Sequence, residues 1–202
     1  MVEFYAEVAA VAVKEACEQV PQMPASSKTA STIIKEVGRH VPEAIVFKAE
    51  GDEGCGIRKT RFSSDGRAWD LATIKGGVTL CAFDTSQNYF VSYSADINRL
   101  AIRHVPLIAK LLVEEYGWKL DDVEVVVPHQ VTRSITERLM KIVGLPLEKA
   151  MITVHKYGNT AAASVPMALA HAVEEGRVKR DSKVMLVGGA SRFSVGVIMA
   201  VF

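Results

Sequence analysis

Two polar side chains are expected just past the ends of two strands, thirty positions apart. His129 follows an apolar, β-branched run, 123–127, which is typical of a strand covered on both faces. Asn159 follows a shorter apolar run, 151–154, and precedes an alanine-rich one. An imidazole and a carboxamide both carry hydrogen-bond donors. Because ligands and catalytic groups collect at the carboxyl ends of strands in an open α/β sheet, we expect both side chains to converge on one edge of the sheet.

Each of these side chains also has a purely structural explanation. His129 could simply be hydrogen-bonded at a strand end. Asn159 stands before an alanine-rich run, where asparagine is a favoured helix N-cap. Capping uses only the side-chain oxygen, so the amide NH2 stays free to donate and both roles can hold at once. The asparagine in the equivalent place of the next unit favours a functional site for His129.

The elements around these residues alternate as in an α/β protein. In chain order we predict strand 123–127, helix 132–143, strand 151–154, helix 160–175 and strand 183–187. This is a βαβαβ run of parallel strands. Residues 193–202 form a last apolar strand, and the loop before it is too short for a crossover, so it should be antiparallel. The predicted fold class is α/β, with a mixed sheet covered by helices.

The chain before this unit is less regular. Residues 2–20 are alanine-rich with polar residues at helical spacing, which predicts a helix. The Pro/Ser stretch 21–30 is the best candidate for a boundary. We therefore divide the chain into an N-terminal helical segment with its loop, 1–40, and an α/β unit, 41–202. Further predicted elements are strands at 44–49, 57–62, 71–74 and 78–83 and a helix at 96–116.

Composition and charge exclude several classes of protein. Hydrophobic residues make up 49% and charged residues 23%, which is ordinary for a globular protein, and a net charge of +1 gives no reason to expect nucleic-acid binding. No apolar run approaches the roughly 18 residues of a membrane span, and no signal-peptide pattern is present. The three cysteines show neither a paired framework nor CxxC metal spacing. We therefore expect a cytoplasmic protein with no metal site and no nucleic-acid or membrane partner.

Several motifs of the second half resemble one enzyme family. The histidine of Pro-His-Gln, 128–130, stands thirty positions before the asparagine of Gly-Asn-Thr-Ala-Ala-Ala-Ser-Val-Pro, 158–166. Together with Gly-Leu-Pro-Leu-Glu-Lys at 144–149, Glu-Glu-Gly-Arg-Val-Lys-Arg-Asp at 174–181 and Gly-Gly-Ala-Ser-Arg-Phe-Ser-Val-Gly at 188–196, these motifs resemble the C-terminal half of β-ketoacyl-acyl-carrier-protein synthase III, a thiolase-fold enzyme. The resemblance is strong over 96–202, weaker over about 43–75, and poor before that.

The resemblance implies a chemistry for His129 and Asn159, which match the His and Asn of the family's Cys-His-Asn triad. In this family a cysteine thiolate takes an acyl group from a thioester. The His and Asn then hydrogen-bond the carbonyl oxygen of a malonyl thioester while it loses carbon dioxide, and two fixed donors stabilise the enolate. The implied substrates are acyl and malonyl thioesters of coenzyme A or acyl carrier protein, as in fatty-acid or polyketide-type synthesis. No permanently bound cofactor is expected.

The resemblance also implies a role for the glycine-containing segment before the last strand. By itself, Gly188-Gly189 is typical of a flexible turn. In the family, a glycine-rich loop here offers a backbone N–H to the oxyanion of acyl transfer, which makes Gly188, Gly189, Ala190 and Arg192 candidates. Residues 190–192 stand where the family has glycines, and Arg192 resists the backbone angles open to glycine.

Three basic residues lie on or beside the helix after His129, namely Arg133, Arg138 and Lys141. A solvated helix face would explain them. In the family, a basic surface here binds the acidic carrier protein or the phosphates of coenzyme A. The family's basic residue five positions after the His corresponds to Ser134, although Arg133 is adjacent.

The nucleophile is missing from this pattern, because the family's cysteine belongs to an N-terminal half that we expect this chain to lack. Cys17 lies in a helical pattern, Cys55 in a glycine turn and Cys81 in an apolar strand, so none resembles an activated thiolate at a strand-to-helix elbow. We expect an acyltransferase subunit that supplies His129 and Asn159 while a thiolase-like partner chain supplies the cysteine.

Two other hypotheses remain open. One is a non-catalytic thiolase-like subunit that binds or stabilises a full-length synthase. The other is a fragment of a longer parent that carries the cysteine upstream. In each case we expect the isolated chain to be inactive, and we expect a heterocomplex or a homo-oligomer.

Overall fold

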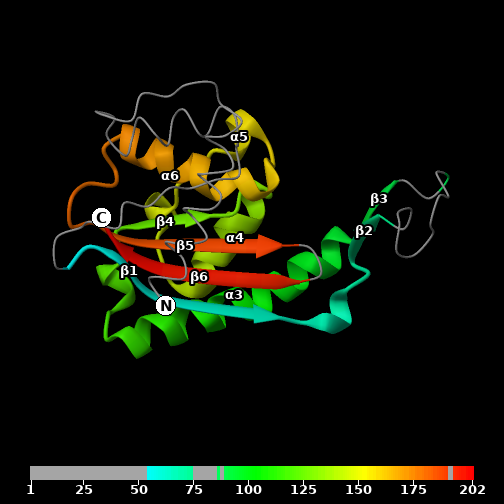
Figure 1. Cartoon of the computed structure of the whole chain (residues 1–202), viewed down its shortest axis with the longest axis horizontal. Coiled ribbons are helices and arrows are strands. Elements are labelled where there is room, and N and C mark those ends of the chain that lie inside the picture. The colour runs from blue at the N-terminus through cyan, green and yellow to red at the C-terminus, as the bar shows by residue number, and fades with distance from the viewer. Residues whose placement is uncertain (1–53, 75–85, 87–88, 191–192) are drawn as a thin grey trace, which may run out of the picture.

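A computed structural model of the chain describes residues 54–74, 86, 89–190 and 193–202 (Figure 1). Its centre is a four-stranded sheet. The strands, in spatial order, are β1 (Gly56–Ser64), β6 (Ser194–Val201), β5 (Lys183–Ala190) and β4 (Val125–Pro128). β4 and β5 are parallel, whereas β6 is antiparallel to both β5 and β1. The mixed sheet and its antiparallel last strand are therefore confirmed.

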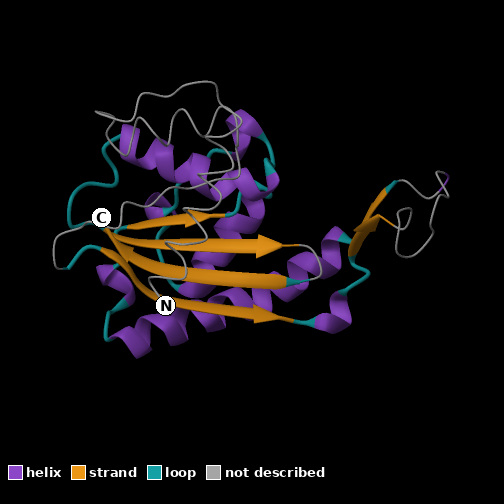
Figure 2. Cartoon of the chain, viewed as in Figure 1, coloured by secondary structure: helices purple, strands orange, loops and turns teal. Residues whose placement is uncertain are grey.

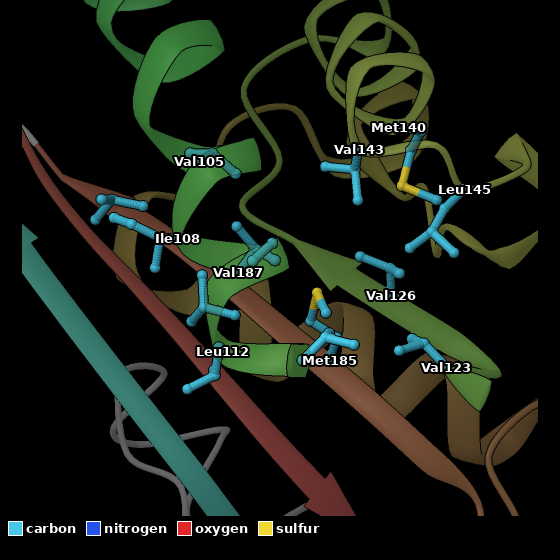
Figure 3. Close-up of a cluster of buried hydrophobic side chains, with 14 of the residues drawn as sticks. Val105, Ile108, Leu112, Val123, Val126, Met140, Val143, Leu145, Met185 and Val187 are labelled. Atoms are coloured by element: carbon cyan, nitrogen blue, oxygen red, sulfur yellow. The ribbon is translucent and has the colours of Figure 1, made fainter. Parts of the chain in front are cut away.

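Helices cover both faces of this sheet (Figure 2). α3 (Ser94–Tyr116) and α4 (Arg133–Val143) pack on one face, where their apolar side chains meet those of the strands (Figure 3). α6 (Ser164–Glu174) packs on the other face. The predicted helices 96–116, 132–143 and 160–175 correspond to α3, α4 and α6.

Alternating side chains of β4 and β5 explain why these strands are almost wholly apolar. Val126 and Met185 point into the cluster beneath α3 and α4, whereas Val125, Val184 and Leu186 point into the cluster beneath α6. All five are buried. A strand covered on both faces needs apolar residues at every position, which is the pattern that predicted these strands.

The shorter elements connect these layers. β2 (Ala72–Ile74) and β3 (Phe90–Ser92) form an antiparallel pair that projects from the sheet beyond the start of α3 (Figure 1). The remaining elements are the 3-10 turns η1 (Gly66–Ala68), η3 (Leu120–Asp122), η4 (Leu147–Lys149) and η5 (Ala161–Ala163) and the short helix α5 (Val154–Tyr157). α3 and α4 end at Gly117 and Gly144, both in the left-handed conformation that glycine adopts without strain.

The predicted strand 151–154 is wrong. Residues 151–153 lie in a loop, and residue 154 begins α5. What remains of strand pairing is one parallel bridge between Val126 and Ala150, with the Met151 N–H donating to the Val126 carbonyl at 2.8 Å. The backbone groups that a strand would have paired are bound instead by a side chain, that of Gln130. The βαβαβ run is therefore reduced to two paired parallel strands, β4 and β5.

The predicted strands 57–62, 71–74 and 183–187 are confirmed as β1, β2 and β5. The predicted helix 2–20, loop 21–30 and strands 44–49 and 78–83 lie outside the described residues, so the boundary between 1–40 and 41–202 stays a prediction. Within the described part of the chain, no helix is long and apolar enough to cross a membrane.

Candidate active site

Gln130 joins the end of β4 to the loop that leads to Asn159. Its Nε2 donates to the carbonyl oxygens of Pro128 at 2.7 Å and Met151 at 3.0 Å. Its Oε1 accepts from the backbone N–H groups of Thr153 at 2.8 Å and Val154 at 3.0 Å. Gln130 is 1% exposed, so this one amide satisfies buried groups on both sides of the site.

His129 precedes Gln130 and contacts Ser164, the first residue of α6. Its backbone N–H donates to the Val187 carbonyl at 2.7 Å, which fixes it at the carboxyl end of β5 as well as β4. Its Nδ1 lies 2.5 Å from Oγ of Ser164. Burial lowers the pKa of the His129 imidazole below its ordinary value of 6.5, so the neutral ring predominates near neutral pH.

Asn159 lies between α5 and η5 and is exposed. Its Oδ1 accepts from the Ala161 backbone N–H at 3.0 Å, while its Nδ2 donates to no residue that the structure describes. The asparagine oxygen thus binds a backbone N–H, as expected. It does so at the start of η5, however, whereas Ala163 occupies the N-cap position of α6.

One hydrogen-bonded path joins the two candidate residues. Asn159 holds the Ala161 N–H, and the Ala161 carbonyl accepts from Oγ of Ser164 at 2.8 Å. The same Oγ contacts the imidazole of His129. His129 and Asn159 therefore belong to one network at the carboxyl end of β4. The histidine is half-buried, and the asparagine amide is open to solvent.

The glycine-containing segment is part of the sheet. Gly188, Gly189 and Ala190 belong to β5 and pair with residues 196, 195 and 194 of β6. The interpretation of Gly188-Gly189 as a flexible turn is therefore wrong. Because Val187 receives the His129 N–H, the three residues that follow it lie at the same end of the sheet as His129. Arg192 lies outside the described residues.

The basic residues of α4 are exposed and separate from this network. Arg133 Nε lies 2.7 Å from Glu137 Oε1, an ion pair one turn along the helix, so its charge is partly neutralised. Arg138 and Lys141 form no ion pair with any residue that the structure describes. They are the two cations of this helix that remain available to an anionic partner.

Cys55 is not part of the site. Its sulfur lies 4.0 Å from Asp181 Oδ1, next to the amino end of β5, whereas His129 is attached to Val187 near the other end. Cys17 and Cys81 lie outside the described residues. Among the described residues, no group of three or more histidine, cysteine, aspartate or glutamate side chains could hold a metal ion.

Gln130 and Ser164 were missed as site residues. Gln130 is the third residue of the Pro-His-Gln motif, and Ser164 is the hydroxyl residue in the alanine-rich run 161–168. A polar residue within an otherwise apolar run needs a buried partner, which is the signal that could have pointed to Ser164.

The fold is a mixed sheet between helical layers, with a histidine and an asparagine in one network at the carboxyl end of β4. This arrangement is that of the C-terminal half of a thiolase-like fold. Residues 113–201 match the family model "3-Oxoacyl-[acyl-carrier-protein (ACP)] synthase III C terminal". The chain is thus homologous to the β-ketoacyl-acyl-carrier-protein synthase III family over that family's C-terminal half.

Individual relatives agree with this assignment. β-Ketoacyl-acyl-carrier-protein synthase III of Ruegeria sp. (strain TM1040) is 33% identical over 161 residues, which are 77% of this chain and 49% of the relative. The enzyme of Neisseria gonorrhoeae (strain NCCP11945) is 30% identical over 156 residues, 77% of this chain and 48% of the relative. The crystal structure of the Aquifex aeolicus VF5 enzyme superposes with a TM-score of 0.67 at 26% identity, over 76% of this chain and 46% of that chain. The chain spans about half the length of the curated relatives it matches.

Proposed function

We propose that the chain is an acyltransferase subunit of the β-ketoacyl synthase III type, which contributes His129 and Asn159 to a thioester condensation site. The observation that carries this proposal is the hydrogen-bonded path from His129 through Ser164 and Ala161 to Asn159. The nucleophilic cysteine comes from a thiolase-like partner chain or an upstream half. The proposal assumes the reducing cytoplasm, where a thiol persists.

The substrates in this proposal are acyl and malonyl thioesters of coenzyme A or acyl carrier protein. When a malonyl thioester loses carbon dioxide, the electron pair of the broken C–C bond moves onto the thioester carbonyl, and an enolate oxygen forms. Nδ2 of Asn159 and Nε2 of His129 would each donate to that oxygen. Fixed donors in a site closed to water stabilise such a charge by a few kcal/mol each. Arg138 and Lys141 are candidates for contacting the carrier protein or the phosphates of coenzyme A.

A non-catalytic thiolase-like subunit is the second candidate. It is favoured by one feature of the sequence, the Ala190-Ser191-Arg192 segment that stands where the family has glycines. In that case His129 and Asn159 would serve only to hold the loop and the start of α6 in place.

Kinetics of malonyl-coenzyme A decarboxylation separate the two candidates. The assay uses the chain purified together with its cysteine-bearing partner. His129→Ala and Asn159→Asp should each lower kcat and kcat/KM together, by about a hundredfold or more. Asn159→Asp keeps an oxygen for the Ala161 N–H and replaces the amide donor with a negatively charged acceptor. Asn98→Asp, the same change on α3, serves as the matched control and should leave both constants unaltered. Wild-type rates in both site variants, with assembly intact, would leave only the structural role.

A further inference from the structure

The hydroxyl of Ser164 has one hydrogen but lies close to three polar groups. Its Oγ lies 2.5 Å from His129 Nδ1, 2.8 Å from the Ala161 carbonyl oxygen and 3.3 Å from the Gln130 backbone nitrogen. Ser164 is 1% exposed, so these groups are its immediate surroundings. A serine hydroxyl offers one hydrogen and two lone pairs. The direction of that one hydrogen determines the role left to the imidazole.

Two arrangements of hydrogens are possible around this oxygen. If the hydroxyl donates to Nδ1, then Oγ and the Ala161 carbonyl oxygen stand 2.8 Å apart with no hydrogen between them, which is repulsive. If the hydroxyl donates to Ala161, its two lone pairs accept from the Gln130 N–H and from an Nδ1–H of His129. Each of the three contacts then holds one hydrogen. The second arrangement satisfies every group, as a buried polar cluster requires.

We propose that Ser164 is a positioning residue that keeps the proton of neutral His129 on Nδ1 and leaves Nε2 as a hydrogen-bond acceptor. The conformation of Ala161 supports this assignment. Its φ of 50° lies in the left-handed region that alanine rarely adopts, so the surroundings must hold it there. Asn159 binds its N–H, and Ser164 binds its carbonyl, which commits the hydroxyl hydrogen to that side.

The consequence for chemistry rests on the proposed function. Asn159 can donate as it stands, whereas His129 donates to an enolate oxygen only after Nε2 gains a proton. A thiol of the completing half can supply it: the S–H bond breaks, an Nε2–H bond forms, and a thiolate remains beside an imidazolium. Because burial disfavours the imidazolium, an anion must lie next to the ring: first the thiolate and, once the thiolate is acylated, the malonyl carboxylate and the enolate that forms from it. The isolated chain therefore holds His129 as an acceptor, and only a completed site converts it to a donor.

NMR spectroscopy of the full chain tests the proton position directly. Long-range 1H–15N spectra of a 15N-histidine-labelled sample, recorded well above the ordinary histidine pKa, show which ring nitrogen carries the proton. The signals of His129, one of five histidines, are identified by their loss in His129→Gln. We expect the Nδ1–H pattern in the wild-type chain and a shift in Ser164→Ala toward the Nε2–H form that free histidine favours. Ser182→Ala, which removes a buried serine away from the site, should leave the His129 signals unchanged.

An Nε2–H pattern in the wild-type chain would overturn the proposal, as would an Nδ1–H pattern that survives Ser164→Ala. If Ser164→Ala does not fold, the proposal is tested by the spectra of the wild-type chain and of Ser164→Thr. The threonine keeps the hydroxyl, so both spectra should show the Nδ1–H form. None of these spectra depends on turnover. A chain with the Nδ1–H pattern whose complex fails to decarboxylate malonyl-coenzyme A would therefore contradict the proposed function alone.

Discussion

At the scale of single residues, the geometry around His129 depends on two buried polar side chains. Ser164 touches the imidazole directly, and Gln130 binds the end of β4 to the backbone of residues 151–154. Neither can be replaced by an apolar residue without leaving backbone groups unpaired. An amide with two donors and two acceptors is the one neutral side chain that matches two carbonyls and two N–H groups.

Gln130→Met should therefore destabilise the chain strongly although it preserves side-chain length. The change leaves two buried carbonyls, the buried Thr153 N–H and the partly buried Val154 N–H without their partner. Each costs about 1–3 kcal/mol when fully unsatisfied, and the loop can partly relax, so we expect a loss of about 3 kcal/mol. The urea unfolding midpoint measures it. Thr153→Val, in the same loop, retains the backbone bonds and should cost under about 1 kcal/mol. Equal midpoints for the two variants would contradict the assigned role of Gln130.

At the scale of elements, α3 contributes much of the core on its face of the sheet. Leu112 is 0% exposed and packs into the cluster beneath α3 and α4, whereas Leu107, on the same helix, is 57% exposed. We expect Leu112→Ala to cost about 3 kcal/mol, because a buried leucine loses both transfer energy and packing. Leu107→Ala should stay within about 0.5 kcal/mol. Urea unfolding of the two variants tests this, and similar costs would mean that α3 packs differently.

The elements also show what hydrophobic pattern can and cannot predict. β4, β5 and β6 are apolar runs covered on both faces or paired on both edges, so their sequences identify them. The run 151–154 has the same apolar character, yet one glutamine side chain far along the sequence binds its N–H groups. These hydrogen bonds compete with strand pairing, and they are tertiary contacts that no local sequence pattern contains. Likewise, Gly188 and Gly189 continue a strand because the partner strand β6 extends alongside them.

The site itself was only partly predictable. His129 could be placed at the end of β4 because an apolar run precedes it. Asn159 follows the short helix α5 and not a strand, so its predicted place at a strand end is wrong. The resemblance supplied the chemistry proposed for both. The bond from His129 to Ser164 depends on how α6 packs against β4, and the left-handed Ala161 has no signature in residue type. These features determine the state of the imidazole, and they emerge only when the layers are assembled.

At the scale of the whole molecule, the described part of the chain exposes several large apolar side chains. Phe62 on β1 is 61% exposed, and Ile74 and Phe90 on the β2–β3 pair are 55% and 65% exposed. Exposed apolar patches mark interaction surfaces, and the chain spans about half the length of its relatives. We therefore predict an oligomer or an obligate heterocomplex. Light scattering at micromolar concentration should give a mass above that of one chain, and a monodisperse monomer would count against this.

The most direct test of the central claim, that His129 and Asn159 act on one oxygen, is a double-mutant cycle. It compares decarboxylation of malonyl-coenzyme A by the partnered chain in wild type, His129→Ala, Asn159→Asp and the double variant. If both side chains donate to the same enolate oxygen, the second substitution should cost much less than it does alone, so the double variant falls far short of the product of the singles. A double variant whose loss equals that product would show that the two residues act independently and would contradict the claim.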